Sequence, residues 1–208
     1  MRFIQTGIYN MMPMRITIPL LALLLFISGC ATASKEEYWR IAIGAPKHYP
    51  IWVTNMHLEK SGVRSWKQPV GSVGCCWKGP LGPRGKGAQA DPFPELVFLT
   101  WFSFAEQKYF AKLIKLTPDI LEKMREKATV YTSEGSFEDV RHTLILGLAP
   151  GGTVVGWILN QRGNEIEVMR MQASEIDGDP AEFTVGTEQY LKEHGDYLKK
   201  HGLQLDKW

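Results

Sequence analysis

An apolar stretch near the start of the chain limits which residues are available for folding. Residues 16–27 are mainly apolar, follow the basic side chains Arg2 and Arg15, and lead into Ser28-Gly29. A basic start, an apolar segment and a small-residue cleavage site are typical of a secretory signal peptide. The segment is shorter than the roughly 20 apolar residues of a membrane-spanning helix. We therefore expect residues 1–29 to be a removed leader that contributes nothing to the fold.

The end of this leader resembles the lipobox of bacterial lipoproteins. Ile27, Ser28, Gly29 and Cys30 stand where that motif has an aliphatic residue, a small residue, Gly or Ala, and the lipidated cysteine. The resemblance implies cleavage between Gly29 and Cys30, a diacylglyceryl group on the Cys30 side chain and an acyl chain such as palmitate on its amine. Several chains together give stable anchoring. Ala31, in place of Asp, implies sorting to the periplasmic face of the outer membrane.

The remaining chain, Cys30 to Trp208, has a size and charge that suit one globular domain. Loss of Arg2 and Arg15 from the 24 basic side chains leaves 22, which balance the 22 acidic ones. A neutral balance provides no basic face for nucleic acid, so no nucleic-acid partner is expected. We expect residues 30–37 to be a lipidated tether and residues 38–208 a single domain.

Alternating apolar residues predict most of the secondary structure. The expected strands are residues 38–44, 51–59, 95–105, 108–115, 143–148, 153–159 and 165–171. Thr117-Pro118 marks the start of a short mid-chain helix whose apolar positions continue to Ala128. A second helical pattern runs from Thr187 to His201 and stops at Gly202. The sequence therefore predicts an α+β fold, mostly antiparallel sheet with a short mid-chain helix and a C-terminal helix, and with a loop over 132–139.

A Gly- and Pro-rich segment, residues 69–94, is expected to be irregular. Glycine-rich turns can hold phosphates, but the spacing of Pro80, Gly85 and Gly87 does not match a phosphate-binding loop. We therefore expect Arg84 and Lys86 to be ordinary surface residues.

The same segment contains a pair of neighbouring cysteines, Cys75 and Cys76, just before Trp77. Once Cys30 carries lipid, these are the two remaining thiols. A disulfide between neighbours is strained, because consecutive Cα atoms lie about 3.8 Å apart, although an oxidising compartment favours it. The alternatives are two buried thiols or a reactive pair. The sequence leaves these three interpretations open.

Motifs of catalysis and of metal binding are missing from the sequence. It contains no Gly-x-Ser-x-Gly elbow and no His-Glu-x-x-His zinc motif. His194 and His201 share a helical stripe, but two histidines without a matched carboxylate predict packing or surface roles. We therefore expect no catalytic residue, no metal site and no cofactor, and a protein that is not an enzyme.

Several segments resemble a family of small Gram-negative lipoproteins of unknown function. They are Tyr49-Pro50-Ile51-Trp52-Val53, Gly74-Cys75-Cys76-Trp77, Leu96 to Trp101, Lys108-Tyr109-Phe110 and Gly156-Trp157. The chain is also similar to lipoproteins that act as immunity proteins against phospholipase effectors of the type VI secretion system. This resemblance implies a periplasmic binding protein whose partner is a secreted lipase.

The expected interface of such a binding protein lies in the Gly/Pro-rich loop, with Trp66 or Trp77 as exposed anchors, and a core position for each Trp stays an equal alternative. Two other functions remain open. One is an envelope lipoprotein with a structural or ligand-binding role and no toxin partner, and the other is an envelope hydrolase whose site is assembled from distant residues.

Overall fold

Sheet A is the first of two large β-sheets in this computed structural model, which describes residues 38–75, 77 and 83–208. Its strand order is β12-β11-β10-β1-β5. The strands are β1 (Arg40–Gly44), β5 (Lys86–Gln89), β10 (Thr143–Ala149), β11 (Thr153–Leu159) and β12 (Ile166–Gln172). β1 and β10 pair in parallel, and the other neighbours pair antiparallel. The middle of β10 is buried on both faces, as the apolar run Leu144 to Leu148 predicts.

Sheet B has the strand order β13-β7-β6-β2-β3, and β4 also pairs with β2. The strands are β2 (Ile51–Lys60), β3 (Arg64–Lys67), β4 (Gly71–Val73), β6 (Leu96–Ser103), β7 (Lys108–Lys115) and β13 (Ser174–Ile176). All its pairs are antiparallel. The turn between β6 and β7 contains Gln107 at a φ of 52°.

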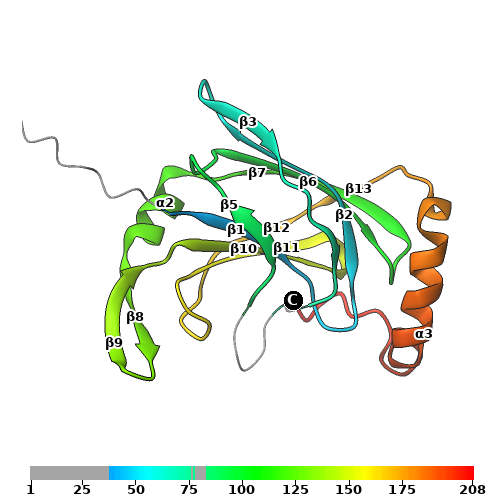
Figure 1. The fold of residues 1–208 in the computed structure, drawn as a ribbon. Helices are drawn as coiled ribbons and strands as arrows, with labels where there is room; N and C mark the ends of the chain where they lie inside the picture. Colours follow the sequence, from blue (N-terminus) through cyan, green and yellow to red (C-terminus); the bar gives the residue numbers. More distant parts are fainter. Residues whose placement is uncertain (1–37, 76, 78–82) are drawn as a thin grey trace, which may run out of the picture. The chain divides into compact units, whose positions relative to one another are not determined.

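The two sheets enclose one apolar core (Figure 1). Ile41 and Leu144 enter it from sheet A, and Leu58, Leu99 and Trp101 enter it from sheet B, all five with no exposed surface. Alternation along each strand is what directs these side chains inward. Residues Glu37–Trp208 form a compact unit that contains both sheets and this core.

The outer faces of both sheets also carry aromatic clusters. On sheet A, Trp77 meets Trp157 and Trp208 edge-on, at ring-centroid distances of 4.9 and 5.6 Å. On sheet B, Phe102 and its neighbours are covered by the 3-10 turn η3 (Pro180–Phe183) and by helix α3 (Thr184–His201). Figure 1 shows α3 lying to one side of sheet B.

The α+β class, the mostly antiparallel sheets and both helices are confirmed, and two local expectations are wrong. Helix α2 (Pro118–Arg125) ends before Ala128, and β8 (Lys127–Thr132) and β9 (Gly135–Val140) form a hairpin where a loop was expected. β-Branched and aromatic residues favour strands there, and Gly135, at a φ of 139°, closes the turn. The irregular segment 69–94 contributes the short strands β4 and β5.

No helix of the described residues is long and apolar enough to cross a membrane.

Candidate functional site

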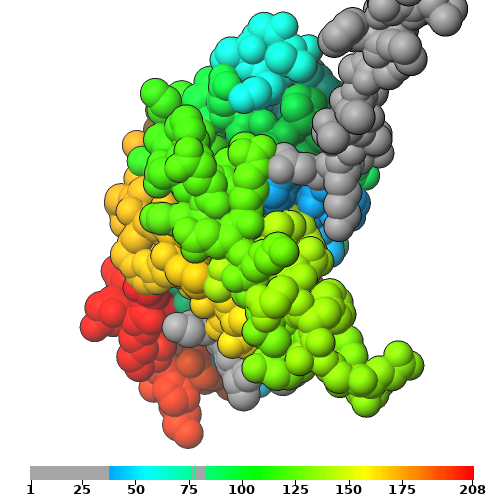
Figure 2. All heavy atoms as spheres, turned by 90° about the vertical axis from the view of Figure 1, so that its left-hand side faces the viewer, coloured from blue at the N-terminus to red at the C-terminus, as the bar shows by residue number. Residues whose placement is uncertain are grey.

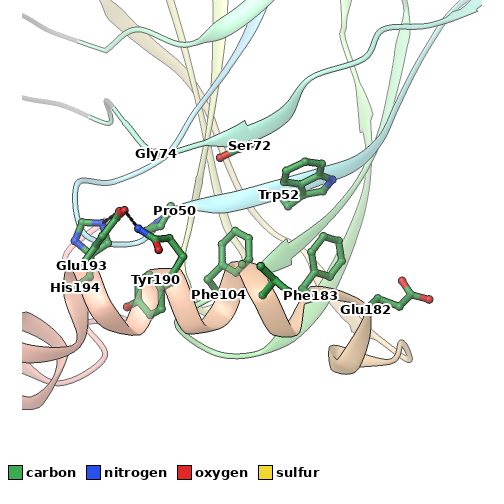
Figure 3. Close-up of a pocket in the computed structure, with 13 residues that line it drawn as sticks. Pro50, Trp52, Ser72, Gly74, Phe104, Glu182, Phe183, Tyr190, Glu193 and His194 are labelled. Carbon is green, nitrogen blue, oxygen red and sulfur yellow. Dashed lines mark hydrogen bonds and ion pairs between the residues drawn. The ribbon is translucent and has the colours of Figure 1, made fainter.

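An aromatic groove of about 600 Å³ lies between α3 and the outer face of sheet B (Figure 3). Its apolar wall is formed by Trp52, Phe104, Phe183 and Tyr190, and one end is polar, with Gln189, Glu193 and His194. A volume of this size is typical of small-molecule sites. We use the name aromatic groove for this cavity below.

The strand period places Trp52 in the groove. Its neighbours Ile51 and Val53 point into the core, so Trp52 points outward from β2 and keeps 40% of its surface exposed. Phe183 is held in place because its ring stacks on Phe102, with centroids 4.6 Å apart. The groove therefore combines a fixed aromatic floor with one accessible indole ring.

A glycine allows α3 to approach the sheet closely at this point. A Cβ atom on Gly186 would lie 2.7 Å from Cε1 of Phe104, which is closer than real Cβ contacts. Any larger residue at position 186 would push the helix away from the sheet. Gly186 thus sets the width of the groove.

His48 and Tyr197 pack beside His194, next to the polar end of the groove. His48 Nδ1 lies 3.4 Å from His194 Nδ1, and the His48 ring stacks on Tyr197 at 3.8 Å. Burial, and next the nearby His194, lower the pKa of His48 because both disfavour the charged ring. His48 adopts a φ of 74°, an uncommon conformation for a residue other than glycine. These contacts fasten the middle of α3 to the loop between β1 and β2.

Tyr190 contributes a buried hydroxyl beneath the groove. It is 3% exposed, and its hydroxyl has no hydrogen-bond partner among the residues that the structure describes. Burial raises the pKa of Tyr190 to about 12, so the hydroxyl stays protonated at neutral pH. Tyr190 is therefore a neutral wall residue rather than a base.

The described lining of the groove contains no Lys or Arg, but it has the carboxylates of Glu182 and Glu193. Groups of three or more His, Cys, Asp or Glu placed to hold a metal are likewise absent from the described part of the chain. Aromatic rings and carboxylates favour a neutral or cationic ligand with an apolar surface. The arrangement suits binding, and it provides no nucleophile paired with a base.

The β8–β9 hairpin is the second candidate surface. It pairs with no other strand of the described chain and projects from the sheets (Figures 1 and 2). Residues 131–138 are all exposed, with Tyr131 at 69% and Phe137 at 52%. Tyr131 pairs with Ser136, and Phe137 with Val130, so the two aromatic side chains lie on opposite faces.

Side-chain amides of the β11–β12 loop hold this hairpin in place. Asn160 Nδ2 donates to the carbonyls of Ala128, at 2.9 Å, and Asp139, at 2.7 Å. Gln161 binds the backbone of Tyr131 twice, donating to its carbonyl at 2.7 Å and accepting from its N–H at 2.9 Å. An isolated two-stranded hairpin is marginally stable in water. The amide clamp therefore presents Tyr131 and Phe137 in a fixed geometry.

The predicted anchors Trp66 and Trp77 do not form an exposed pair. Trp77 is 8% exposed and lies in the cluster on sheet A, so its expected exposure is wrong and it is a packed residue. The reason is that β10 and β11 leave an apolar outer face that the indole covers. Trp66 on β3 is half-buried against the core, and Arg64 lies 4.8 Å above its ring.

The predicted cysteine sites lie partly outside the described residues. Cys75 is exposed and disulfide-bonded, so a buried thiol at this position is wrong. Cys76, Cys30 and the cleavage site at Gly29 are not among the described residues. Pairing between neighbours, and lipidation, stay predictions.

Sequence reasoning did not find the functional surfaces described here. The outward position of Trp52 follows from strand alternation, which was a usable signal. His194 packs against His48 and Tyr190, in agreement with a packing role. The hydrogen bonds from Asn160 and Gln161 to the hairpin could not be predicted from the sequence, because polar residues such as Asn are common in turns whether or not they bind another segment.

Comparison with known proteins identifies a family. Residues 28–206 match the model described as "Protein of unknown function (DUF2931)". The chain belongs to the DUF2931 family. This match covers most of the 208 residues and confirms the expected membership of a family of unknown function. No curated protein and no solved structure matches this DUF2931 chain.

Proposed function

We propose that this DUF2931 protein is a lipid-anchored envelope lipoprotein that works by binding a protein partner. Its anchor is Cys30, at the periplasmic face of the outer membrane. Its partner is a secreted phospholipase effector of the type VI secretion system, which it inhibits as an immunity protein. The lipobox resemblance supports the anchor, and the family match, which starts at residue 28, includes Cys30. The protein performs no catalytic step in this proposal.

The single observation that carries the binding role is the clamped β8–β9 hairpin. Its two large aromatic side chains, Tyr131 and Phe137, are mostly exposed. Aromatic side chains often dominate binding energy at interfaces. A hairpin fixed before binding loses little conformational entropy when it enters a partner's cleft. Insertion of such an element is a direct way to block an active site.

Affinity capture with the soluble chain, residues 31–208, tests the partner. Secreted and envelope fractions are passed over this bait, and captured proteins are assayed for hydrolysis of phospholipid vesicles. We expect a lipolytic enzyme whose activity falls in proportion to added DUF2931 protein. Recovery of no lipolytic enzyme, or of one that stays fully active in the complex, would contradict the immunity role.

A pair of variants tests the hairpin within that complex. Tyr131→Ala with Phe137→Ala should weaken binding at least about 30-fold, because truncating one interface hot spot costs about 2 kcal/mol or more. Leu113→Ala removes a side chain that is 59% exposed on β7 and serves as the control. Equal binding by the double variant and the control would show that the hairpin is not the interface.

The anchor is tested separately in cells. Wild-type protein should incorporate labelled palmitate and sediment with membranes, whereas Cys30→Ser should lose the label. Labelling of the Cys30→Ser variant would refute Cys30 as the lipidated residue.

The aromatic groove favours a second candidate function, a carrier of a small ligand without a toxin partner. Trp52 is well placed to report occupancy, because its indole is 40% exposed beside the cavity. A change in fluorescence on adding an apolar amine, lost in Trp52→Phe, would favour this alternative. Unchanged Trp52 fluorescence with all apolar and cationic compounds tested would contradict the carrier function.

A further inference from the structure

A second cavity, of about 310 Å³, lies over the outer face of sheet A. Its lining includes Arg40, Arg84 and Arg162, together with His142, Thr143 and Asn160. Aspartate and glutamate are absent from this lining, as far as the described residues show. We call this cavity the arginine pocket.

Three separate parts of the sequence supply its cations. Arg40 begins β1, Arg84 lies just before β5, and Arg162 belongs to the loop between β11 and β12. Pairing of β1 with both β5 and β10 brings these segments to one region of sheet A. The sequence alone did not associate Arg84 with Arg40 or Arg162, because the three arginines are far apart along the chain.

Arg40 and Arg162 bring two positive charges to this pocket without an acidic side chain in its described lining. Arg40 Nη2 donates to the Gly87 carbonyl at 3.4 Å, and neither Arg40 nor Arg162 forms an ion pair with another described residue. Guanidinium groups repel one another when they line one small cavity. The DUF2931 chain as a whole is close to neutral, so this concentration of charge is local.

Arginine side chains lining a cavity are suited to a phosphate group. The planar guanidinium provides paired N–H donors that match phosphate oxygens. Low-dielectric walls focus the positive field within a pocket. The volume of about 310 Å³ accommodates one phosphate with its ester substituents, and the Thr143 hydroxyl lies in the same lining.

We propose that the arginine pocket binds the headgroup phosphate of an anionic phospholipid in the membrane that carries the protein. The choice of source rests on the proposed anchor at Cys30. Arg40 follows Cys30 by ten residues, so the two lie at most about 35 Å apart along an extended chain. A phosphate contact at the start of β1 would fix the orientation of the domain on the membrane.

Flotation with lipid vesicles tests this pocket without the anchor. The soluble chain, residues 31–208, is mixed with vesicles of phosphatidylcholine alone or with phosphatidylglycerol added. We expect binding to the phosphatidylglycerol vesicles. Arg40→Gln with Arg162→Gln should weaken it roughly 25-fold, because a basic residue near an anionic surface contributes about fivefold. Lys67→Gln with Lys192→Gln removes equal charge elsewhere and should change binding much less.

Two further arms identify the ligand chemistry and its source. Vesicles with oleate in place of phosphatidylglycerol present carboxylates, and equal binding to them would overturn phosphate recognition. Inorganic phosphate is titrated while the amide NMR signals of Arg40 and Thr143 are followed. Shifts there without vesicle binding would overturn the membrane as the source.

These outcomes are separable from those of the proposed function. The vesicle assay lacks Cys30, so it does not depend on lipidation or on a lipase partner. Equal loss of binding in both double variants would show a diffuse charge effect and overturn the pocket. Thermal unfolding of each variant confirms that it is folded.

Discussion

Replacing Asn160 with alanine tests whether the β11–β12 loop holds the β8–β9 hairpin in place. The substitution removes the two hydrogen bonds that Asn160 donates to the hairpin, at the carbonyls of Ala128 and Asp139, and one that it accepts from Asn164. Each bond to the hairpin contributes about 1 kcal/mol net, so the hairpin should open more easily by about 2 kcal/mol. Because 1.4 kcal/mol is a factor of ten, the population of the open hairpin should rise about 30-fold.

Native-state hydrogen exchange, resolved by residue, measures this opening. We expect the backbone amides of β8 and β9 to exchange about 30-fold faster in Asn160→Ala, while the amides of β10 keep their rates, because the hairpin opens as a local unit. Asn55→Ala removes the same side chain from β2 and should leave the hairpin unchanged. Unchanged exchange in residues 127–140, or equal acceleration throughout sheet A, would refute the clamp and weaken the case for a preformed binding element.

Three further predictions concern stability. Gly186→Ala should lower the unfolding free energy by about 1–3 kcal/mol, because the new Cβ clashes with Phe104. Gly195→Ala on the same helix should raise the unfolding free energy by up to about 1 kcal/mol, because the new Cβ meets its nearest neighbour at 4.0 Å. Chemical denaturation of both variants measures the difference. Trp77→Ala should cost about 3–5 kcal/mol, as expected of a buried indole, and a loss under 1 kcal/mol would contradict its packing. Burial lowers the pKa of His48, so the folded state binds fewer protons than the unfolded state just below pH 6.5. Thermal stability should therefore rise with pH just below 6.5 and level off above it. His48→Asn should flatten this rise, and asparagine tolerates the positive φ at this position.

The elements with a strong local pattern were predictable. The alternation in residues 51–59 and 108–115 identified β2 and β7, because a strand with one buried face needs apolar side chains at every second position. Helix α3 followed from its apolar stripe and from Gly202, which adopts a φ of 67° at the helix end. The hairpin over 127–140 was missed, since its exposed residues need not be apolar.

The candidate sites were less predictable than the elements. Alternation along β2 places Trp52 on the outer face of its strand, whereas no local pattern indicates that Trp77 is buried. Their burial is decided by what covers them: Trp157 and Trp208 pack on Trp77, whereas the edge of the aromatic groove leaves Trp52 accessible. Such coverage depends on residues that are remote in sequence.

The sequence by itself determined the predicted leader, the α+β class and most strands of this DUF2931 protein, because these follow from periodicity and composition within short windows. The tertiary structure decided which surfaces are available for binding. It brought Arg40, Arg84 and Arg162 to one pocket and joined Asn160 to the hairpin. The physical reason is that binding sites depend on distances and burial between residues far apart in the chain, which no local pattern encodes.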